Sequence, residues 1–325
     1  MRRSLLWIAA AVLMALPSCR YKDLCYDHNH DTEHNFILHL TLQLDIDVDI
    51  EVSDEDHTKI KVPTYMVVAF YDTLSGDLRS MEYVNAYGGP LHVSPGTYDM
   101  MVYSFDTEWT QVRGEGNINK LEAYTSDITK SKMHQMSMFG PDTTQAPGPI
   151  IYTPDHLLVT RKRVEIPPYS LDEQVITIEA TASTVVKTYA FEVKNMTGIE
   201  YVAGADAYIT NQSRANYFGC GGISKEPATI YFPMSVSKKG KSLKCSFNTF
   251  GKLPGDSRSY LNVVVTDTEG KPHTMVTDIT DQFGKTDRTI VVEDSIVIPP
   301  PSGGGGGIAP TVEEWEEENH DVPIG

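Results

Sequence analysis

The chain has 325 residues, and at roughly 100–200 residues per domain this length predicts two domains with tails. Apolar residues make up 40% and charged residues 22%, so the composition excludes a globally disordered chain and allows a buried core. Lys and Arg number 27 against 44 Asp and Glu. The net charge of −17 disfavours sequence-independent binding to nucleic acid, and four cysteines are too few for a disulfide scaffold.

The first residues predict export and lipid attachment. Arg2 and Arg3 precede an apolar run over residues 5–16, which is too short for the roughly 20 residues that span a bilayer but suits a signal peptide. Ser18 and Cys19 then close the run in the manner of a bacterial lipobox. We therefore expect a type II signal peptide over residues 1–18, cleavage between Ser18 and Cys19, and acylation of Cys19. The alternative is an ordinary signal peptide with a chance cysteine.

The segment that follows residues 19–35 has the pattern of β-strands. Over residues 36–52 every even position is apolar and nearly every odd position is polar, which predicts a strand with one buried and one solvated face. Residues 65–71 and 78–84 flank a turn and predict a hairpin. A Pro-Gly turn at 95–96 leads into a further strand over 98–105. Residues 106–149 are rich in Gly and Pro and predict long loops with one strand or short helix.

The second half repeats this strand-and-turn pattern. Strand-like runs cover residues 150–152, 157–159, 175–180, 185–193, 201–209, 229–232, 243–247, 261–266, 273–276 and 289–297. Many short strands without a long helical period favour β-sandwiches. With a boundary expected at Pro167–Pro168, the predicted organisation is signal peptide 1–18, tether 19–35, an N-terminal β-sandwich 36–167, a C-terminal β-sandwich 168–298, and a Pro/Gly linker with an acidic tail 299–325.

Several motifs together resemble a known family. They are Cys19 with the adjacent residues 21–28, the strand entry 95–98, the stretches 193–198 and 205–210, and the linker followed by residues 312–315. In their order along the chain they resemble the FimB-type fimbrillin-anchor lipoproteins of Bacteroidales, minor-fimbria anchors included. The resemblance implies two transthyretin-like β-sandwich domains on a lipid tether in the outer membrane. It also implies no enzymatic activity and no cofactor.

The tail after five consecutive glycines is expected to be an appendage of the second domain, because ordering such a linker costs backbone entropy. As a hypothesis, it pairs with the sheet edge of a fimbrillin subunit by strand addition. The residues that would take part are Ile308, Val312, Trp315, Val322 and Ile324. The alternative is a disordered acidic tail.

Two groups of potential metal ligands do not predict a metal site. Cys25, His28, His30 and His34 lie next to the lipid attachment point, and their spacing is not one that zinc sites use. The acids between Asp45 and Glu51 imitate the start of an EF-hand loop, but Ile50 stands where that loop needs glycine. We interpret these acids as the solvated face of one strand.

Cys220 and Cys245 allow a disulfide in an exported protein, with free buried thiols as the alternative, because sequence does not place their Cα atoms. The Gly-Cys-Gly-Gly stretch at 219–222 has no identifiable His and acid partners. No Gly-x-Ser-x-Gly, His-Glu-x-x-His or P-loop pattern occurs. The sequence therefore predicts a protein that is not an enzyme.

Three functions remain open at this point: an anchor that holds the base of a fimbria and limits its growth, a polymerising stalk or tip subunit, and a surface glycan-binding lipoprotein. For the last, Trp109 is the one tryptophan outside the signal peptide and the tail, although the 17 tyrosines keep that function open.

The resemblance implies that stalk subunits lose their first strand to an Arg-specific protease, which opens a groove for another subunit. Here no arginine lies between Arg20 and Arg79, while Lys59 and Lys61 would serve only a lysine-specific enzyme. We therefore expect the first strand to stay in place and the chain to be a non-polymerising base.

Overall fold

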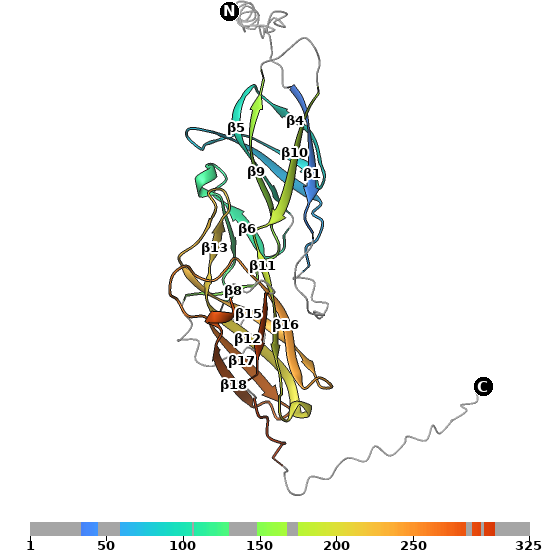
Figure 1. Cartoon of the computed structure of the whole chain (residues 1–325), viewed down its shortest axis with the longest axis vertical. Coiled ribbons are helices and arrows are strands. Elements are labelled where there is room, and N and C mark those ends of the chain that lie inside the picture. The colour runs from blue at the N-terminus through green and yellow to red at the C-terminus, as the bar shows by residue number, and fades with distance from the viewer. Residues whose placement is uncertain are drawn as a thin grey trace, which may run out of the picture.

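The computed structural model describes residues 34–44, 59–105, 107–129, 148–167, 175–283, 288–293 and 296–302. Two domains built from β-sheets lie end to end along the long axis (Figure 1). In these residues the helical elements are short 3-10 turns, such as Ile118–Lys120. The predicted all-β, two-domain fold is confirmed.

The N-terminal domain contains seven strands whose hydrogen-bonded order, β1-β10-β9-β5-β2-β3-β4, returns to β1 as a closed barrel. The strands are β1 (His34–Leu42), β2 (Tyr65–Asp72), β3 (Leu78–Asn85), β4 (Gly88–Val93), β5 (Gly96–Ser104), β9 (Leu158–Ile166) and β10 (Ile176–Thr184). β2 and β3 form the hairpin that the sequence predicted, and β1 lies between β4 and β10. The part of the expected first strand after residue 44 lies outside the described residues.

Alternation along each strand separates the inside of this barrel from its outer surface. On β2, Met66, Val68 and Phe70 face the barrel core, whereas Val67 and Ala69 face outward. All five are fully buried, because the outer surface of β2 is itself covered. A strand that is buried on both faces reads as a continuous apolar run, as residues 65–71 do in the sequence.

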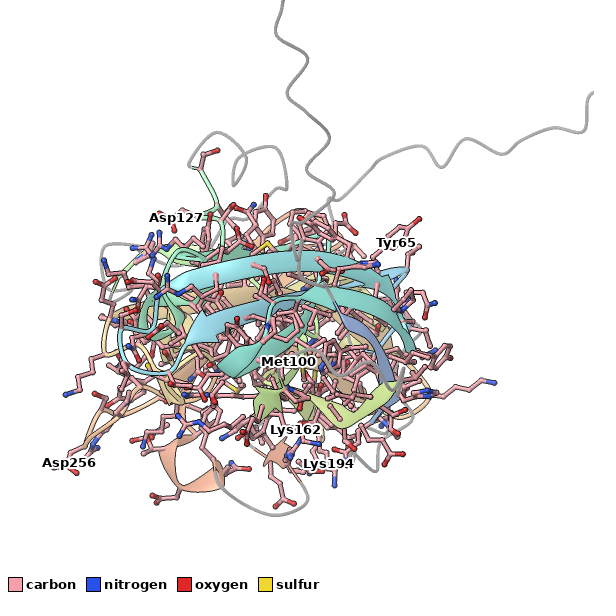
Figure 2. All side chains as sticks on the ribbon, turned by 90° about the horizontal axis from the view of Figure 1, so that it is seen from above. Tyr65, Met100, Asp127, Lys162, Lys194 and Asp256 are labelled. Atoms are coloured by element: carbon pink, nitrogen blue, oxygen red, sulfur yellow. The ribbon has the colours of Figure 1, made fainter. Side chains whose placement is uncertain are left out.

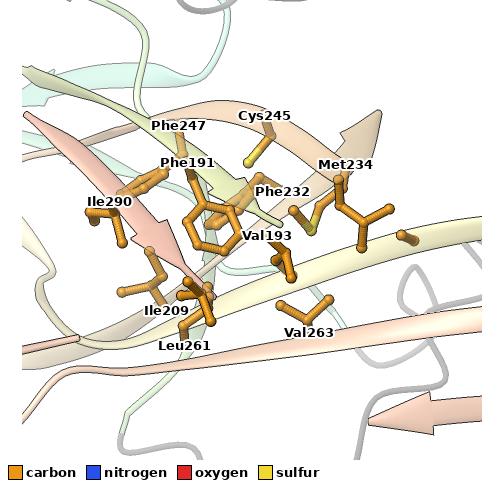
Figure 3. Close-up of a cluster of buried hydrophobic side chains, with 14 of the residues drawn as sticks. Phe191, Val193, Ile209, Phe232, Met234, Cys245, Phe247, Leu261, Val263 and Ile290 are labelled. Carbon is orange, nitrogen blue, oxygen red and sulfur yellow. The ribbon is translucent and has the colours of Figure 1, made fainter. Parts of the chain in front are cut away.

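The C-terminal domain has the sheet order β18-β17-β12-β15-β16-β11-β19, with β8 (Ile150–Tyr152) attached to β15. Its strands are β11 (Lys187–Val193), β12 (Val202–Ser213), β15 (Pro227–Ser237), β16 (Ser242–Thr249), β17 (Tyr260–Asp267), β18 (Pro272–Asp278) and β19 (Thr289–Val292). Between them lies one core in which Phe232 stacks on Phe247 with ring centroids 4.7 Å apart, and Phe191 lies nearby (Figure 3).

The two domains share one strand order. If β1 corresponds to β11, β2 to β12, β3 to β15, β4 to β16, β5 to β17, β9 to β18 and β10 to β19, then the two sheet paths coincide strand for strand. In both domains the first strand pairs in parallel with the last. The one difference is that β9 meets β10, whereas β18 and β19 are the two ends of an open path. The chain therefore carries the same β-topology twice.

The sheets do not change at the boundary expected at residues 167 and 168. β10 follows that boundary yet pairs with β1 and β9, because its inward side chains Ile178 and Ala182 complete the first core. β8 precedes the boundary yet pairs with β15 of the second domain. The chain passes from the first set of sheets to the second between Thr184 and Lys187.

The region expected to be long loops contributes to a further small sheet. β6 (Thr110–Arg113) and β7 (Glu122–Thr125) pair with each other, and β7 pairs with β13 (Ala215–Tyr217), which in turn pairs with β14 (Gly222–Ile223). These strands are two to four residues long, too short to show a period in the sequence. Because β6 and β7 come from the first half of the chain and β13 and β14 from the second, this small sheet joins the halves.

Candidate functional site

The first strand occupies a central position in the N-terminal barrel. β1 pairs in parallel with β10 from Phe36↔Ile176 to Leu42↔Ala182, and antiparallel with β4 from His34↔Val93 to His39↔Gly88. Both backbone edges of β1 are therefore engaged. A strand held on both sides is part of the sheet, and its removal would leave unpaired backbone groups on two neighbours.

The inward side chains of β1 fill the barrel. Phe36 is 0% exposed, Leu38 1% and Leu40 6%, and all three belong to the barrel core. At roughly 1.5–3 kcal/mol per fully buried large apolar side chain, together they contribute roughly 5–9 kcal/mol, comparable with the whole stability of a domain. The domain therefore depends on β1 for its core.

A glycine fixes the edge against which β1 lies. Gly88, at the turn from β3 to β4, has φ +100°, and a Cβ there would lie 1.8 Å from the carbonyl oxygen of Leu38. The neighbouring Tyr87 accepts a hydrogen bond from the amide of Leu40 at 2.9 Å. Only glycine allows this approach, because any side chain would collide with the backbone of β1.

The first arginine in the described residues lies inside a paired strand. Arg79 belongs to β3, and its guanidinium is 2.8 Å from the carboxylate of Asp72 on the preceding strand. Arg79 itself is the extra residue at a register shift in the β2–β3 pairing, because Leu78 is opposite Tyr71 and Ser80 is opposite Phe70. A cut here would fall after β2 and would separate β2 from β3 as well as removing β1.

The candidate site has two features: the paired first strand β1, described above, and an apolar contact between the two domains, here called the joint. The outer surface of β2 and β5 packs against Phe218 and Phe250 from the second half of the chain, and the rings of Tyr103 and Phe218 are 5.5 Å apart. Members of this cluster are Val67, Ala69, Tyr71, Met101, Tyr103, Ile118, Leu121, Ala123, Leu157, Val159, Val186, Phe218 and Phe250. Because both halves contribute buried residues to one cluster, the joint has a core of its own.

Gly219 lets the two halves approach closely. A Cβ at this position would lie 1.8 Å from the carbonyl oxygen of Ile118 and 2.8 Å from the Cβ of Leu121. The carbonyl of Gly219 also accepts a hydrogen bond from Arg161 of β9 at 2.9 Å. The turn after β13 is thus held against the first domain by both packing and a charge-assisted hydrogen bond.

A buried histidine connects polar groups across the joint. His156 is 8% exposed; its Nδ1 is 2.9 Å from the hydroxyl of Thr184, and its Nε2 is 3.1 Å from that of Thr188. Thr188 in turn donates to the side-chain oxygen of Asn248 at 2.8 Å. This hydrogen-bond network connects four segments: the residues before β9, the end of β10, β11, and β16. Its buried polar groups therefore all have hydrogen-bond partners.

Asp99 organises the arginine that reaches Gly219. Its carboxylate is 2.9 Å from Nη2 of Arg161 and 3.1 Å from Nε of Arg163. Burial by itself would raise the pKa of Asp99. However, the hydrogen bonds from Arg163 and Arg161 outweigh it and hold the pKa of this carboxyl below its ordinary value.

The lowered pKa of Asp99 predicts acid-sensitive stability. A carboxyl whose folded pKa lies below its unfolded pKa stabilises the fold above the unfolded value, near 3.8, and loses that contribution as pH falls through the folded value. We expect Asp99→Asn to lower stability at pH 7 and to differ much less from the parent at pH 3. Urea unfolding at both values checks this. Asp256→Asn, on an exposed loop (Figure 2), is the control; an Asp99→Asn penalty that persists undiminished at pH 3 would contradict the assignment.

The two cysteines of the second half are not bonded to each other. Cys220 is exposed in the turn between β13 and β14 at the joint, whereas the side chain of Cys245 lies in the core of the C-terminal domain beside Phe247 (Figure 3). The disulfide that the sequence allowed is therefore absent, because the two side chains belong to different environments. The stretch 219–222 contributes to the joint through the close packing and the hydrogen bond of Gly219.

Other predicted residues lie outside the described part of the chain. They are Ser18 and Cys19, the Cys25 and His28/His30 group, the acids from Asp45 to Glu51, and the tail residues Ile308, Val312, Trp315, Val322 and Ile324. His34 begins β1. Within the described ranges no three His, Cys, Asp or Glu side chains are grouped to hold a metal ion, and no helix there is long and apolar enough to cross a bilayer.

Sequence reasoning missed the joint. Phe218, Phe250 and His156 were not singled out, because each looks ordinary within its own segment. The available signal was Gly219 directly after a large aromatic residue, a combination that often marks a close approach of two backbones.

The fold and the site together define a class: two-domain, all-β proteins with one strand order repeated, a first strand paired on both edges, and a joint with its own core. The chain belongs to the family described as a domain of unknown function, DUF5119, which matches residues 18–233.

A curated relative from Bacteroides ovatus, provisionally named fimbrium anchoring subunit Fim4B, is 30% identical over 190 residues. The match covers 58% of this chain and 52% of the relative, so it spans about half the relative's length. The resemblance to fimbrial anchor proteins is thereby confirmed.

Solved structures agree on the fold. A Bacteroides ovatus protein, provisionally described as an adhesin, superimposes with a TM-score of 0.55 at 22% identity, over 87% of this chain and 99% of the other. The fimbrial anchor protein Mfa2 of Porphyromonas gingivalis is more distant, with a TM-score of 0.41 at 13% identity over 81% of this chain and 90% of that one. The first likeness supports the fold alone, and the second is too distant to add to it.

Proposed function

We propose that this chain is a non-enzymatic outer-membrane lipoprotein that anchors the base of a fimbria and does not polymerise. The observation that carries the proposal is β1, which fills the barrel and pairs on both edges. A chain whose own first strand occupies the groove has no vacancy for the strand of another subunit. The relative named as an anchoring subunit supports the same role.

Limited growth follows from the same feature. Removal of β1 by an Arg-specific protease would require a cut between β1 and β2, and residues 21–78 contain no arginine. Arg79 lies beyond β2 within the β2–β3 hairpin. The proposal therefore assigns this subunit to one end of the fibre, where it accepts contacts from fimbrillin while β1 still fills its own place in the barrel.

The proposal is tested by the mature N-terminus. Intact mass and N-terminal sequencing of the protein from its native host should give a chain that starts at Cys19 and carries acyl groups. A mature N-terminus downstream of residue 52 would reject the anchor and favour a stalk or tip subunit. An unmodified chain that starts elsewhere before residue 34 would reject the lipid attachment but leave the retained strand intact.

Membrane attachment is proposed to depend on Cys19. We expect Cys19→Ala to move nearly all of the protein from the membrane fraction to the soluble fraction, because acyl chains on this residue would supply the hydrophobic anchor. Cys25→Ala, six residues further on, is the matched control and should stay with the membrane. Fractionation with high salt and carbonate checks both; a Cys19→Ala chain that stays bound would show a different anchor.

The partner is proposed to be a fimbrillin subunit, bound by strand addition through the tail that contains Val312 and Trp315. Extended segments add to sheet edges through main-chain hydrogen bonds, while alternate side chains give specificity. Deleting residues 303–325 should abolish co-purification of fimbrillin and leave the thermal melting temperature nearly unchanged. Continued co-purification would move the contact to the folded domains.

A further inference from the structure

The N-terminal barrel is closed only at one end of the β9–β10 pair. These strands pair through Ser183↔Val159 and Thr184↔Leu158, next to the joint. Beyond them, within the described residues, β10 is paired with β1 alone and β9 with β5 alone over the rest of their lengths. The two strands diverge, and a cleft of about 560 Å³ lies between them, lined by His39, Thr41, Thr160, Arg161, Lys162, Glu179, Ala180 and Thr181.

In the part of the chain that the structure describes, this cleft leaves the facing backbone edges of β9 and β10 without a strand partner. Unpaired strand edges are templates for another chain, and native proteins protect them with charged side chains, above all with charges that point toward the core. The exposed backbone of β9 and β10 therefore needs a device that prevents strand addition.

Lys162 has the position that such a device requires. It pairs with Met100 across β5 and β9, and cross-strand partners share one face of a sheet. Met100 belongs to the barrel core, as do Leu158, Val164 and Ile166, which lie on the same face of β9 as Lys162. Lys162 thus interrupts an inward apolar row, and in the view along the long axis it lies close to Met100 (Figure 2).

The lysine reaches solvent only by passing through the cleft. Although its backbone position faces the core, its side chain is exposed, and its amine donates a hydrogen bond to the carbonyl of Glu179 on β10 at 2.7 Å. The Lys162 side chain therefore spans the cleft from β9 to β10. Its amine binds the Glu179 carbonyl, which would otherwise be available to accept a hydrogen bond from an added strand. A strand laid over the cleft would also trap the charge inside, which is unfavourable without a buried counter-ion.

The second domain gives an internal comparison. In the shared strand order, β18 corresponds to β9 and β17 to β5, and the inward residue at the centre of β18 is Met275, opposite Val263. Met275 packs against the core as an ordinary apolar residue. The lysine is therefore not a requirement of the topology but a property of the N-terminal domain.

We propose that Lys162 is an edge guard: it keeps the β9–β10 cleft from accepting an extended strand of a second copy of this chain. This inference goes beyond the anchoring role and concerns the isolated protein. It predicts that the isolated protein is monomeric although these two strand edges have no strand partner.

The test is the oligomeric state of Lys162→Val in the full chain carrying Cys19→Ala, so that lipid does not cause association. Valine removes the charge from the inward face of β9 and favours strands. We expect a dimer or larger species that grows with concentration in size-exclusion chromatography with light scattering. Hydrogen exchange should slow at the amides of 160–166 and 176–182 on association, while the Lys162 parent stays monomeric.

Three controls separate the guard from other causes. Lys187→Val makes the same chemical change at an exposed position of the interior strand β11 and should remain monomeric. Lys162→Glu keeps an inward charge without the amine and should also remain monomeric. Circular dichroism confirms that each variant is folded.

A folded Lys162→Val chain that stays monomeric at all concentrations would overturn the proposal. Association of Lys187→Val to the same extent would overturn it too, because added apolar surface alone would then suffice. Neither result depends on whether a fimbria is bound, so the anchoring role is tested separately.

Discussion

Leu38→Asp is expected to unfold the N-terminal domain or to lower its stability by about 3–5 kcal/mol, the range for a core side chain replaced by an unpaired buried charge. Leu38 is 1% exposed and lies between Ile178 of β10 and Gly89 of β4 in the sheet register. The carboxylate would find no partner there, and the apolar contacts of the leucine would be lost at the same time. Thermal and urea unfolding followed by circular dichroism measure the loss.

Thr41→Asp is the matched control for this substitution. Thr41 belongs to the same strand but is exposed and faces away from the core. It should change stability by no more than about 0.5 kcal/mol, as surface substitutions usually do. Equal penalties for the two variants would mean that β1 does not hold the barrel together, and the case for a retained first strand would lose its physical basis.

Gly219→Val is expected to separate the two domains while each keeps its own core. The new side chain would occupy the space of the Ile118 carbonyl, 1.8 Å from the ideal Cβ position, so two backbones would have to move apart. The contact between Tyr103 and Phe218 would open with them. We expect a loss of about 1–3 kcal/mol at the joint, the size typical of overpacking.

Two measurements report on the joint directly. Small-angle X-ray scattering should show a wider range of interdomain distances, and thermal unfolding should split into two transitions. Gly222→Val, three residues further on, is the control, because nothing lies within 4 Å of a Cβ at that position. A Gly219→Val protein with the same scattering curve as the parent would contradict the prediction, because the joint would then accommodate the valine side chain without separating the domains.

The sequence was informative wherever one strand face is buried and the other wet. β1 could be predicted because Phe36, Leu38 and Leu40 alternate with polar residues, and period two has a single structural meaning. β18 was predicted only over residues 273–276, as one of several short strand-like runs. The strand order of the sheets could not be predicted in this way. Alternation indicates which face of a single strand is buried, but it does not indicate which strands are neighbours.

The predicted domain boundary shows where this reasoning stops. Pro167 and Pro168 looked like a break between domains, but the strands on either side of them, β9 and β10, both belong to the first domain. Long-range pairing decided the position of β10, and no local residue records it. Lys162 is a similar case, because its inward direction is evident only from its register with Met100.

The parallel pairing of β1 with β10 has a mechanical consequence if the chain is anchored through its N-terminus, as proposed above. β1 starts at the end of the molecule away from the C-terminal domain and runs toward the joint (Figure 1). A pull on the tether, opposed by a load on the far domain, acts along the axis of β1. The hydrogen bonds to β10 and β4 lie across that axis and share the force, so they must fail together instead of one after another. Under such a force the pairing of β1 is loaded in shear. The lifetime of the folded N-terminal domain is then set by the rate at which these hydrogen bonds break together.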